Sequence, residues 1–133
     1  MSRLFGVALA VCLSLGCAGS AFAERITVAD RAGLQAAMTQ HIDRLLVAGV
    51  YLQLKVAEGT VRPLVPAKTH SRILQMGPYF VLCTDFRDQQ GHPVNVDFYV
   101  AREGQNFVVF QTEIGNRGPL QSLMRAGQAR VVE

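Results

Sequence analysis

The sequence predicts an α+β fold: one long N-terminal helix packed on a curved antiparallel meander of four to five strands, with a short C-terminal helix. Three observations predict this fold. Apolar residues between Asp30 and Ala48 recur at helical spacing. Three later segments alternate apolar and polar residues, and the connections between them are short and contain glycine. Together these patterns are typical of an amphipathic helix that covers one face of an antiparallel sheet.

The predicted helix begins near Asp30, a residue type that caps helix N-termini. Its apolar positions form one stripe, and Gly49 is placed to end the helix. The stripe comprises Leu34, Ala37, Met38, Ile42, Leu45 and Ala48. His41 lies in the middle of this stripe, and its type disagrees with its position.

A strand pair is predicted after the helix. Residues 50–57 are rich in types that favour β-structure. We expect Pro63 and Pro66 to interrupt the next strand, because proline cannot donate a ladder hydrogen bond. A further extended stretch is predicted at residues 69–76, where a Gly-Pro turn signal follows.

Three clear strands come next, at residues 79–87, 94–102 and 107–114. Their alternation predicts a core face made of Phe80, Leu82, Thr84, Phe86, Val94, Val96, Phe98, Val100, Val108, Phe110, Thr112 and Ile114. The opposite face is expected to be solvated and carries Cys83, Asp85, Arg87, Asn95, Asp97, Tyr99, Gln111 and Glu113. A short helix is predicted at residues 120–126, because Pro119 suits a first helical turn.

The first residues have the layout of a secretory signal peptide. Arg3 is followed by an apolar run, and Ala21-Phe22-Ala23 offers a cleavage site. Residues 1–23 are therefore predicted to be a signal peptide and residues 24–133 a single α+β domain of the bacterial periplasm or secreted fraction. Lipidation of Cys17 is the alternative, since Gly16 precedes it. The apolar run is too short for a membrane anchor, which takes about 20 residues.

Cleavage would leave Cys83 as the one remaining cysteine, so no disulfide could form within the chain. Such a cysteine is ordinarily a small buried apolar residue. An intermolecular disulfide and a reactive thiol are the functional alternatives. No motif around Cys83 suggests that its thiolate is activated.

Charge and motifs exclude several classes of function. The net charge is +3, and the basic residues form no run, which argues against a nucleic-acid partner. The spacing of His41, His70 and His92 matches no zinc motif, and no metal or cofactor is predicted. No transmembrane segment is expected after signal cleavage.

Two sets of residues are candidate sites. His41, Thr84 and Thr112 would place three polar groups between the helix and the sheet, where a small-molecule pocket can open. The alternative is a buried histidine whose hydrogen bonds are satisfied within the core. The weaker set lies on the polar sheet face and comprises Asp85, Asp97, Tyr99 and Glu113. Paired carboxylates can transfer protons or bind calcium, although carboxylates on a solvated face more often only favour solubility.

The order of elements resembles the cystatin-like and nuclear-transport-factor-like group of folds, in which a helix packs across a bent antiparallel sheet. The segment Leu45–Gly49, with Tyr51, resembles the protease-binding hairpin of cystatins. Leu45 stands where that motif has glutamine, and the chain has no tryptophan, which argues against a protease inhibitor. Residues 91–100, with Phe107 and Ile114, are similar to the closing meander of periplasmic toluene-tolerance proteins, which implies an apolar ligand.

These observations predict a non-enzymatic exported module that binds a protein partner or a small apolar ligand, and that could form a homodimer. The alternative is a small enzyme of the isomerase or hydratase type that uses His41 as a base in a pocket between helix and sheet.

Overall fold

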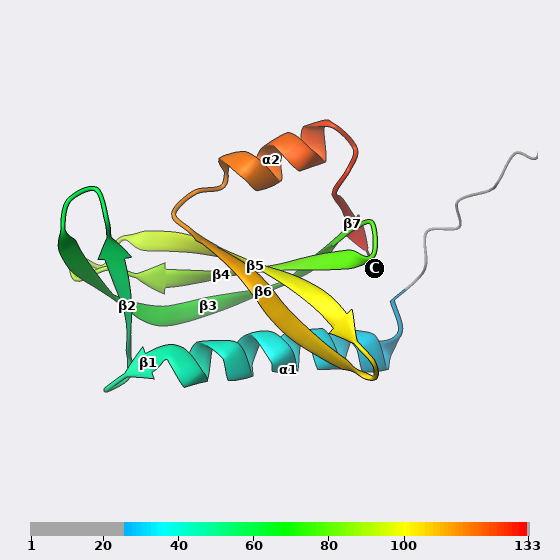
Figure 1. Ribbon diagram of the computed structural model, residues 1–133, viewed down its shortest axis with the longest axis horizontal. Coiled ribbons are helices and arrows are strands. Elements are labelled where there is room, and N and C mark those ends of the chain that lie inside the picture. Colours follow the sequence, from blue (N-terminus) through cyan, green and yellow to red (C-terminus); the bar gives the residue numbers. More distant parts are fainter. Residues whose placement is uncertain (1–25, 133) are drawn as a thin grey trace, which may run out of the picture.

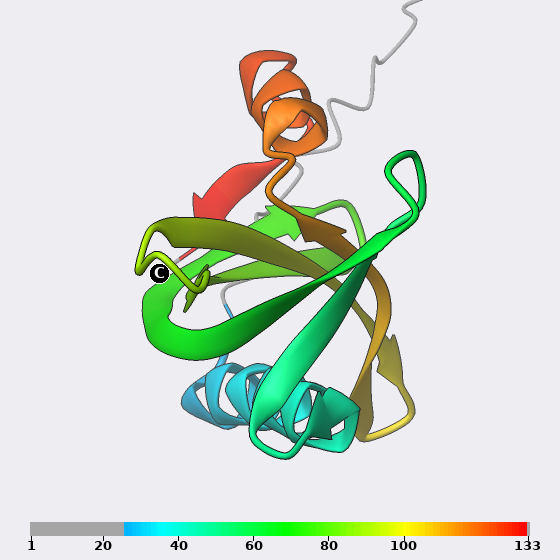
Figure 2. The same cartoon turned by 90° about the vertical axis from the view of Figure 1, so that its left-hand side faces the viewer.

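The computed structural model describes residues 26–132, which fold into a curved antiparallel sheet between two helices (Figure 1). The elements are α1 (Val28–Leu45), β1 (Leu46–Val47), β2 (Val50–Lys55), β3 (Thr60–Met76), β4 (Tyr79–Arg87), β5 (Pro93–Glu103), β6 (Asn106–Ile114), α2 (Gly118–Arg125) and β7 (Arg130–Val132). Figure 2 shows α1 and α2 on opposite faces of the sheet. The predicted α+β class, with a long N-terminal helix and a short C-terminal one, is confirmed.

The predicted signal peptide, its cleavage site and Cys17 lie outside the described residues. Neither α1 nor α2 is long and apolar enough to span a membrane.

Helix α1 begins and ends earlier than the sequence predicts. Its N-cap is Thr27, whose hydroxyl accepts a hydrogen bond from the backbone N–H of Asp30 at 3.0 Å. The Asp30 carboxylate accepts one from the Thr27 N–H at 3.3 Å, so the two residues form a capping box. At the other end, Ala48 and Gly49 adopt positive φ angles of 51° and 81° and join β1 to β2 in a tight turn. Gly49 therefore closes a hairpin rather than the helix.

In residues 26–132 the sheet has seven strands rather than the four to five expected. The order is β1-β2-β3-β4-β5-β6, all pairs are antiparallel, and β7 pairs with β3. The unexpected strands β1 and β7 are too short to show alternation. Strand β3 continues through Pro63 and Pro66, and its pairing with β4 shifts register between Pro66 and Lys68 and again between Thr69 and Ile73. The prolines thus accompany an irregular, strongly bent strand and do not end it.

The face of the sheet beneath α1 forms the larger core. Leu34 and Met38 of α1 are completely buried against Leu82, Val96 and Val100 of β4 and β5, which are also completely buried. This part of the predicted core face is confirmed. Helical spacing of the buried positions of α1 explains why one side of that helix fits the sheet.

Strand β6 departs from the predicted face assignment. Val108 and Phe110 were expected in the core but are 42% and 53% exposed, and Phe107 and Val109 pack against the core instead. The cause is a bulge in which Phe110 is the extra residue, since Tyr99 pairs with Gln111 but Val100 pairs with Val109. Thr112 and Ile114, beyond the bulge, keep the predicted face.

The opposite face is not solvated throughout, as the sequence had suggested. Helix α2 covers part of it and creates a second apolar cluster with β7 nearby (Figure 1). The cluster consists of Leu74, Val81, Cys83, Tyr99, Leu120 and Ala129. A candidate site lies at the edge of this second cluster.

Candidate functional site

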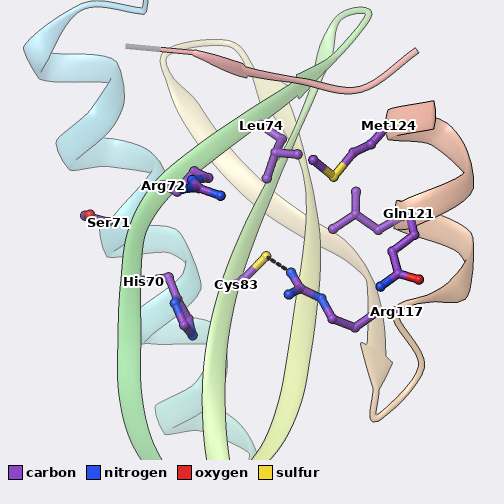
Figure 3. A pocket seen from close by; sticks show the side chains of 9 residues that line it. His70, Ser71, Arg72, Leu74, Cys83, Arg117, Gln121 and Met124 are labelled. Carbon is purple, nitrogen blue, oxygen red and sulfur yellow. Dashed lines mark hydrogen bonds between the residues drawn. The ribbon is translucent and has the colours of Figure 1, made fainter. Parts of the chain in front are cut away.

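A groove opens between α2 and the part of the sheet formed by β3 and β4, with a volume of about 490 Å³ (Figure 3). It is lined by His70, Ser71, Arg72, Leu74, Cys83, Arg117, Leu120, Gln121 and Met124. This volume is within the range of sites that hold small molecules. The groove exists because α2 crosses back over the sheet after β6 and covers only part of its width.

The floor of the groove is apolar. Leu74 of β3 and Leu120 of α2 belong to the second cluster and are 3% and 1% exposed. Met124 lies one helical turn after Leu120 and is 42% exposed, so part of its side chain faces the open space. A flexible thioether beside two fixed leucines can adapt to an apolar group of varied shape.

The walls of the groove carry cationic side chains. Arg72 extends from β3, and Arg117 extends from the residue before α2, and Figure 3 shows both guanidinium groups directed into the groove from opposite sides. His70 lies two residues before Arg72 on the same face of β3. The Ser71 side chain points away in Figure 3, as alternation along a strand requires. Among residues 26–132, no acidic side chain lines the groove.

Arg117 is held by groups behind the groove. Its Nη2 donates to Asp97 Oδ1 and to Cys83 Sγ, each at 3.3 Å. Asp97 is 1% exposed, whereas the Arg117 side chain is 45% exposed. Burial lowers the pKa of Arg117, but the charge of Asp97 and the hydrogen bonds to Asp97 and Cys83 together raise it by more, so it lies above its ordinary value. The guanidinium therefore stays charged and compensates a carboxylate that would otherwise be buried alone.

Cys83 lines the groove without the features of a nucleophile. Burial, followed by the hydrogen bond and the charge of Asp97, raises the pKa of its thiol to about 12. The thiol thus remains protonated at neutral pH, and the thiolate is the reactive form. With 5% of its surface exposed, Cys83 is buried, as an ordinary packing role would require.

His70 also has a carboxylate partner. Its Nε2 lies 3.0 Å from Asp85 Oδ2, and both side chains are partly exposed. The two residues come from adjacent strands, β3 and β4. This pair fixes the histidine ring at one end of the groove.

The three residues predicted to line a pocket beneath α1 lie elsewhere. The His41 ring meets Phe98 edge-on, with ring centroids 5.9 Å apart, and it is partly exposed. Thr84 is buried and donates its hydroxyl hydrogen to the Lys68 carbonyl at 2.8 Å, and Thr112 pairs with Phe98 in the sheet. None of the three lines the groove beneath α2. The Thr84 hydroxyl is satisfied by a backbone carbonyl, whereas no side-chain hydrogen bond of the partly exposed His41 is found among residues 26–132, so the structure shows neither a pocket around His41 nor the fully buried, hydrogen-bonded histidine that was the alternative.

The four residues of the predicted polar face have different environments. Asp97 and Tyr99 are buried, at 1% and 6% exposure, whereas Asp85 and Glu113 are only partly covered. Asp97 pairs directly with Glu113 across the β5–β6 ladder. Asp85 and Asp97, which alternation had predicted to be cross-strand neighbours, pair instead with Asn95 and Cys83. Within residues 26–132, no group of three histidine, cysteine or acidic side chains is arranged to hold a metal ion.

The sequence did not reveal the residues that matter most for the groove, Arg72, Arg117 and the apolar side of α2. One signal was present. Val81, Cys83 and Tyr99 are apolar members of the face expected to be solvated, and Leu120, Leu123 and Met124 recur at helical spacing. Both patterns indicate that α2 covers that face.

Comparisons of the chain with protein-family models, curated proteins and solved structures found no match.

Proposed function

We propose that the protein is an exported, non-enzymatic binding module whose ligand site is the groove between α2 and the sheet. The observation that carries this proposal is the groove itself: a volume of about 490 Å³ in which polar and charged side chains surround a floor of Leu74, Leu120 and Met124. Small-molecule sites likewise combine apolar surface with polar groups that fix the orientation of the ligand. The raised pKa of the Cys83 thiol argues for binding over covalent catalysis.

Export to the bacterial periplasm is part of the proposal and is supported by the leader sequence, Arg3 and Ala21-Phe22-Ala23. The architecture, with α1 packed across a bent antiparallel sheet, supports placing the chain in the cystatin-like or nuclear-transport-factor-like group of folds. A protein partner, a homodimer and an enzyme that uses His41 stay predictions from the sequence.

The test uses Nile red, an uncharged apolar dye whose fluorescence rises when it leaves water. We expect saturable binding to the wild-type protein. The variant Gln121→Trp places a large side chain on the groove side of α2 and should weaken dye binding by about tenfold or more.

Ser122→Trp is the matched control, because Ser122 lies on the same helix, is exposed and does not line the groove. It should bind the dye as the wild-type protein does. Absence of binding to the wild-type protein, or equal binding by the Gln121→Trp variant, would overturn the proposal.

A further inference from the structure

We propose that the ligand of the groove is an amphiphilic anion, with a carboxylate or phosphate head between Arg72 and Arg117 and a short apolar chain on Leu74, Leu120 and Met124. This inference rests on the proposed function and names the class of molecule that the same site would select.

The first argument concerns charge. Arg72 and Arg117 line the groove from opposite walls, so their positive potentials add there and favour an anion (Figure 3). Arg117 is already paired with Asp97, which lies behind the groove, and Asp85 is paired with His70. Among residues 26–132, the Arg72 side chain makes no hydrogen bond or ion pair, so no carboxylate of that part of the chain compensates its charge.

The second argument concerns hydrogen-bond donors. A guanidinium has five N–H donors. Arg117 uses Nη2 for both Asp97 and Cys83, which leaves its Nη1 and Nε groups without a partner in residues 26–132. Arg72 offers its whole guanidinium, and guanidinium groups match carboxylate and phosphate oxygens in a bidentate geometry.

The start of α2 adds to the positive potential. Arg117 is its N-cap residue and makes no side-chain cap, so the N–H groups of Gly118 and Leu120 lack that partner, and Pro119 between them has no N–H. The macrodipole contributes roughly +0.5 of an elementary charge at this end. Anions are therefore favoured at the end of the groove where Arg117 lies.

The apolar floor of the groove indicates that the ligand also has an apolar part. Figure 3 shows Leu74 and Met124 further along the groove than Arg117, and Leu120 also lines the groove. A small inorganic anion would leave this surface in water, whereas an anion that carries an alkyl chain would cover it.

The experiment measures displacement of Nile red by four molecules that share a decyl-length chain and differ in the head: decanoate, decyl phosphate, decanol and decyltrimethylammonium. Both anions should bind the wild-type protein about tenfold or more tightly than decanol, and the cation should bind most weakly. The tighter of the two anions identifies the head as carboxylate or phosphate. Decanol binding as tightly as both anions would overturn the inference while leaving the groove as a binding site.

The variant Arg72→Gln removes the uncompensated charge. Arg72 is exposed and makes no ion pair among the described residues, so the melting temperature should stay unchanged. Affinity for the better anion should fall about tenfold, and affinity for decanol should change by less than about twofold.

Arg125→Gln is the control, since it removes an exposed arginine of α2 that does not line the groove. It should leave both affinities unchanged. An equal loss of anion affinity in both variants would mean that the anions respond to the net charge of the protein, which would overturn the inference. Failure of Nile red to bind at all would instead contradict the proposed function.

Discussion

The face of the sheet beneath α1 and the face beneath α2 both bury apolar side chains, but only the second also buries a carboxylate. Beneath α1 the one buried polar side chain among the described residues is Thr84, whose hydroxyl is satisfied by the Lys68 carbonyl. Beneath α2, Asp97 is 1% exposed, and its negative charge is balanced by the ion pair with Arg117. The first face is a stable core, whereas the second combines a smaller core with a charged groove.

The lengths of the two helices explain the difference. Helix α1 has 18 residues and α2 has 8, which correspond to about 27 Å and about 12 Å along the axis. The nine residues of β4 extend for about 30 Å, so α1 can cover a strand along nearly its whole length and α2 cannot. Polar side chains at the uncovered margin, such as His70 and Arg72, keep access to solvent and to a ligand.

The largest expected effect tests the core beneath α1. Phe98→Ala should cost about 3–5 kcal/mol of the free energy of unfolding, because Phe98 is 1% exposed and its removal leaves a cavity. Phe110→Ala should cost only about 1 kcal/mol, because the bulge leaves Phe110 53% exposed with only edge contacts to aromatic neighbours such as Tyr79. Urea denaturation of the two variants measures both values. Equal losses of unfolding free energy in the two variants would contradict the bulge in β6. They would support the prediction from alternation that Phe110 lies in the core.

The second expected effect separates the two aspartates that the sequence placed on one solvated face. Asp97→Ala should cost about 1–3 kcal/mol, since it removes the buried acceptor of Arg117 and Cys83. The cost is limited because the Arg117 side chain is 45% exposed and can turn to water.

Asp85→Ala is the matched control, from the partly exposed pair with His70, and should cost less than about 1 kcal/mol. Both variants are measured by urea denaturation at pH 7. An Asp97→Ala protein as stable as the Asp85→Ala protein would show that the face beneath α2 is solvated after all.

Local patterns in the sequence predicted the face beneath α1 well and the face beneath α2 poorly. Alternation in β4 and β5 assigns Leu82 and Val96 correctly, because regular antiparallel pairing preserves a period of two residues. Alternation fails at Phe110, where one inserted residue reverses the faces. A bulge of this kind has no clear signature in composition.

The groove depends on contacts between segments that are distant in the sequence. Arg72 and Arg117 come together only because α2 crosses back over the sheet, and β7 then pairs with β3. Sequence periodicity describes one element at a time, so the sequence predicted a helix at residues 120–126 but did not assign that helix to a face of the sheet. The capping box of Thr27 and Asp30 was visible as a sequence motif, and the choice of Asp30 as N-cap was wrong.

The smallest expected effect concerns His41 at the margin of the α1 core. Burial, and secondarily the charge of Arg44, lowers the pKa of His41 below its ordinary value of 6.5. The unfolded chain therefore takes up the proton more readily than the folded one. Protonation of His41 does not reduce the free energy of unfolding above pH 6.5, but it lowers that free energy as the pH drops through 6.5 toward the pKa of His41 in the folded protein. Urea denaturation at a series of pH values should show a loss that is smaller in the variant His41→Gln. The ring is partly exposed beside Phe98, so solvent screening keeps this loss below those of the other variants. An NMR titration that places the pKa of His41 at or above 6.5 would contradict the prediction and show that the ring is not desolvated at the margin of the core beneath α1.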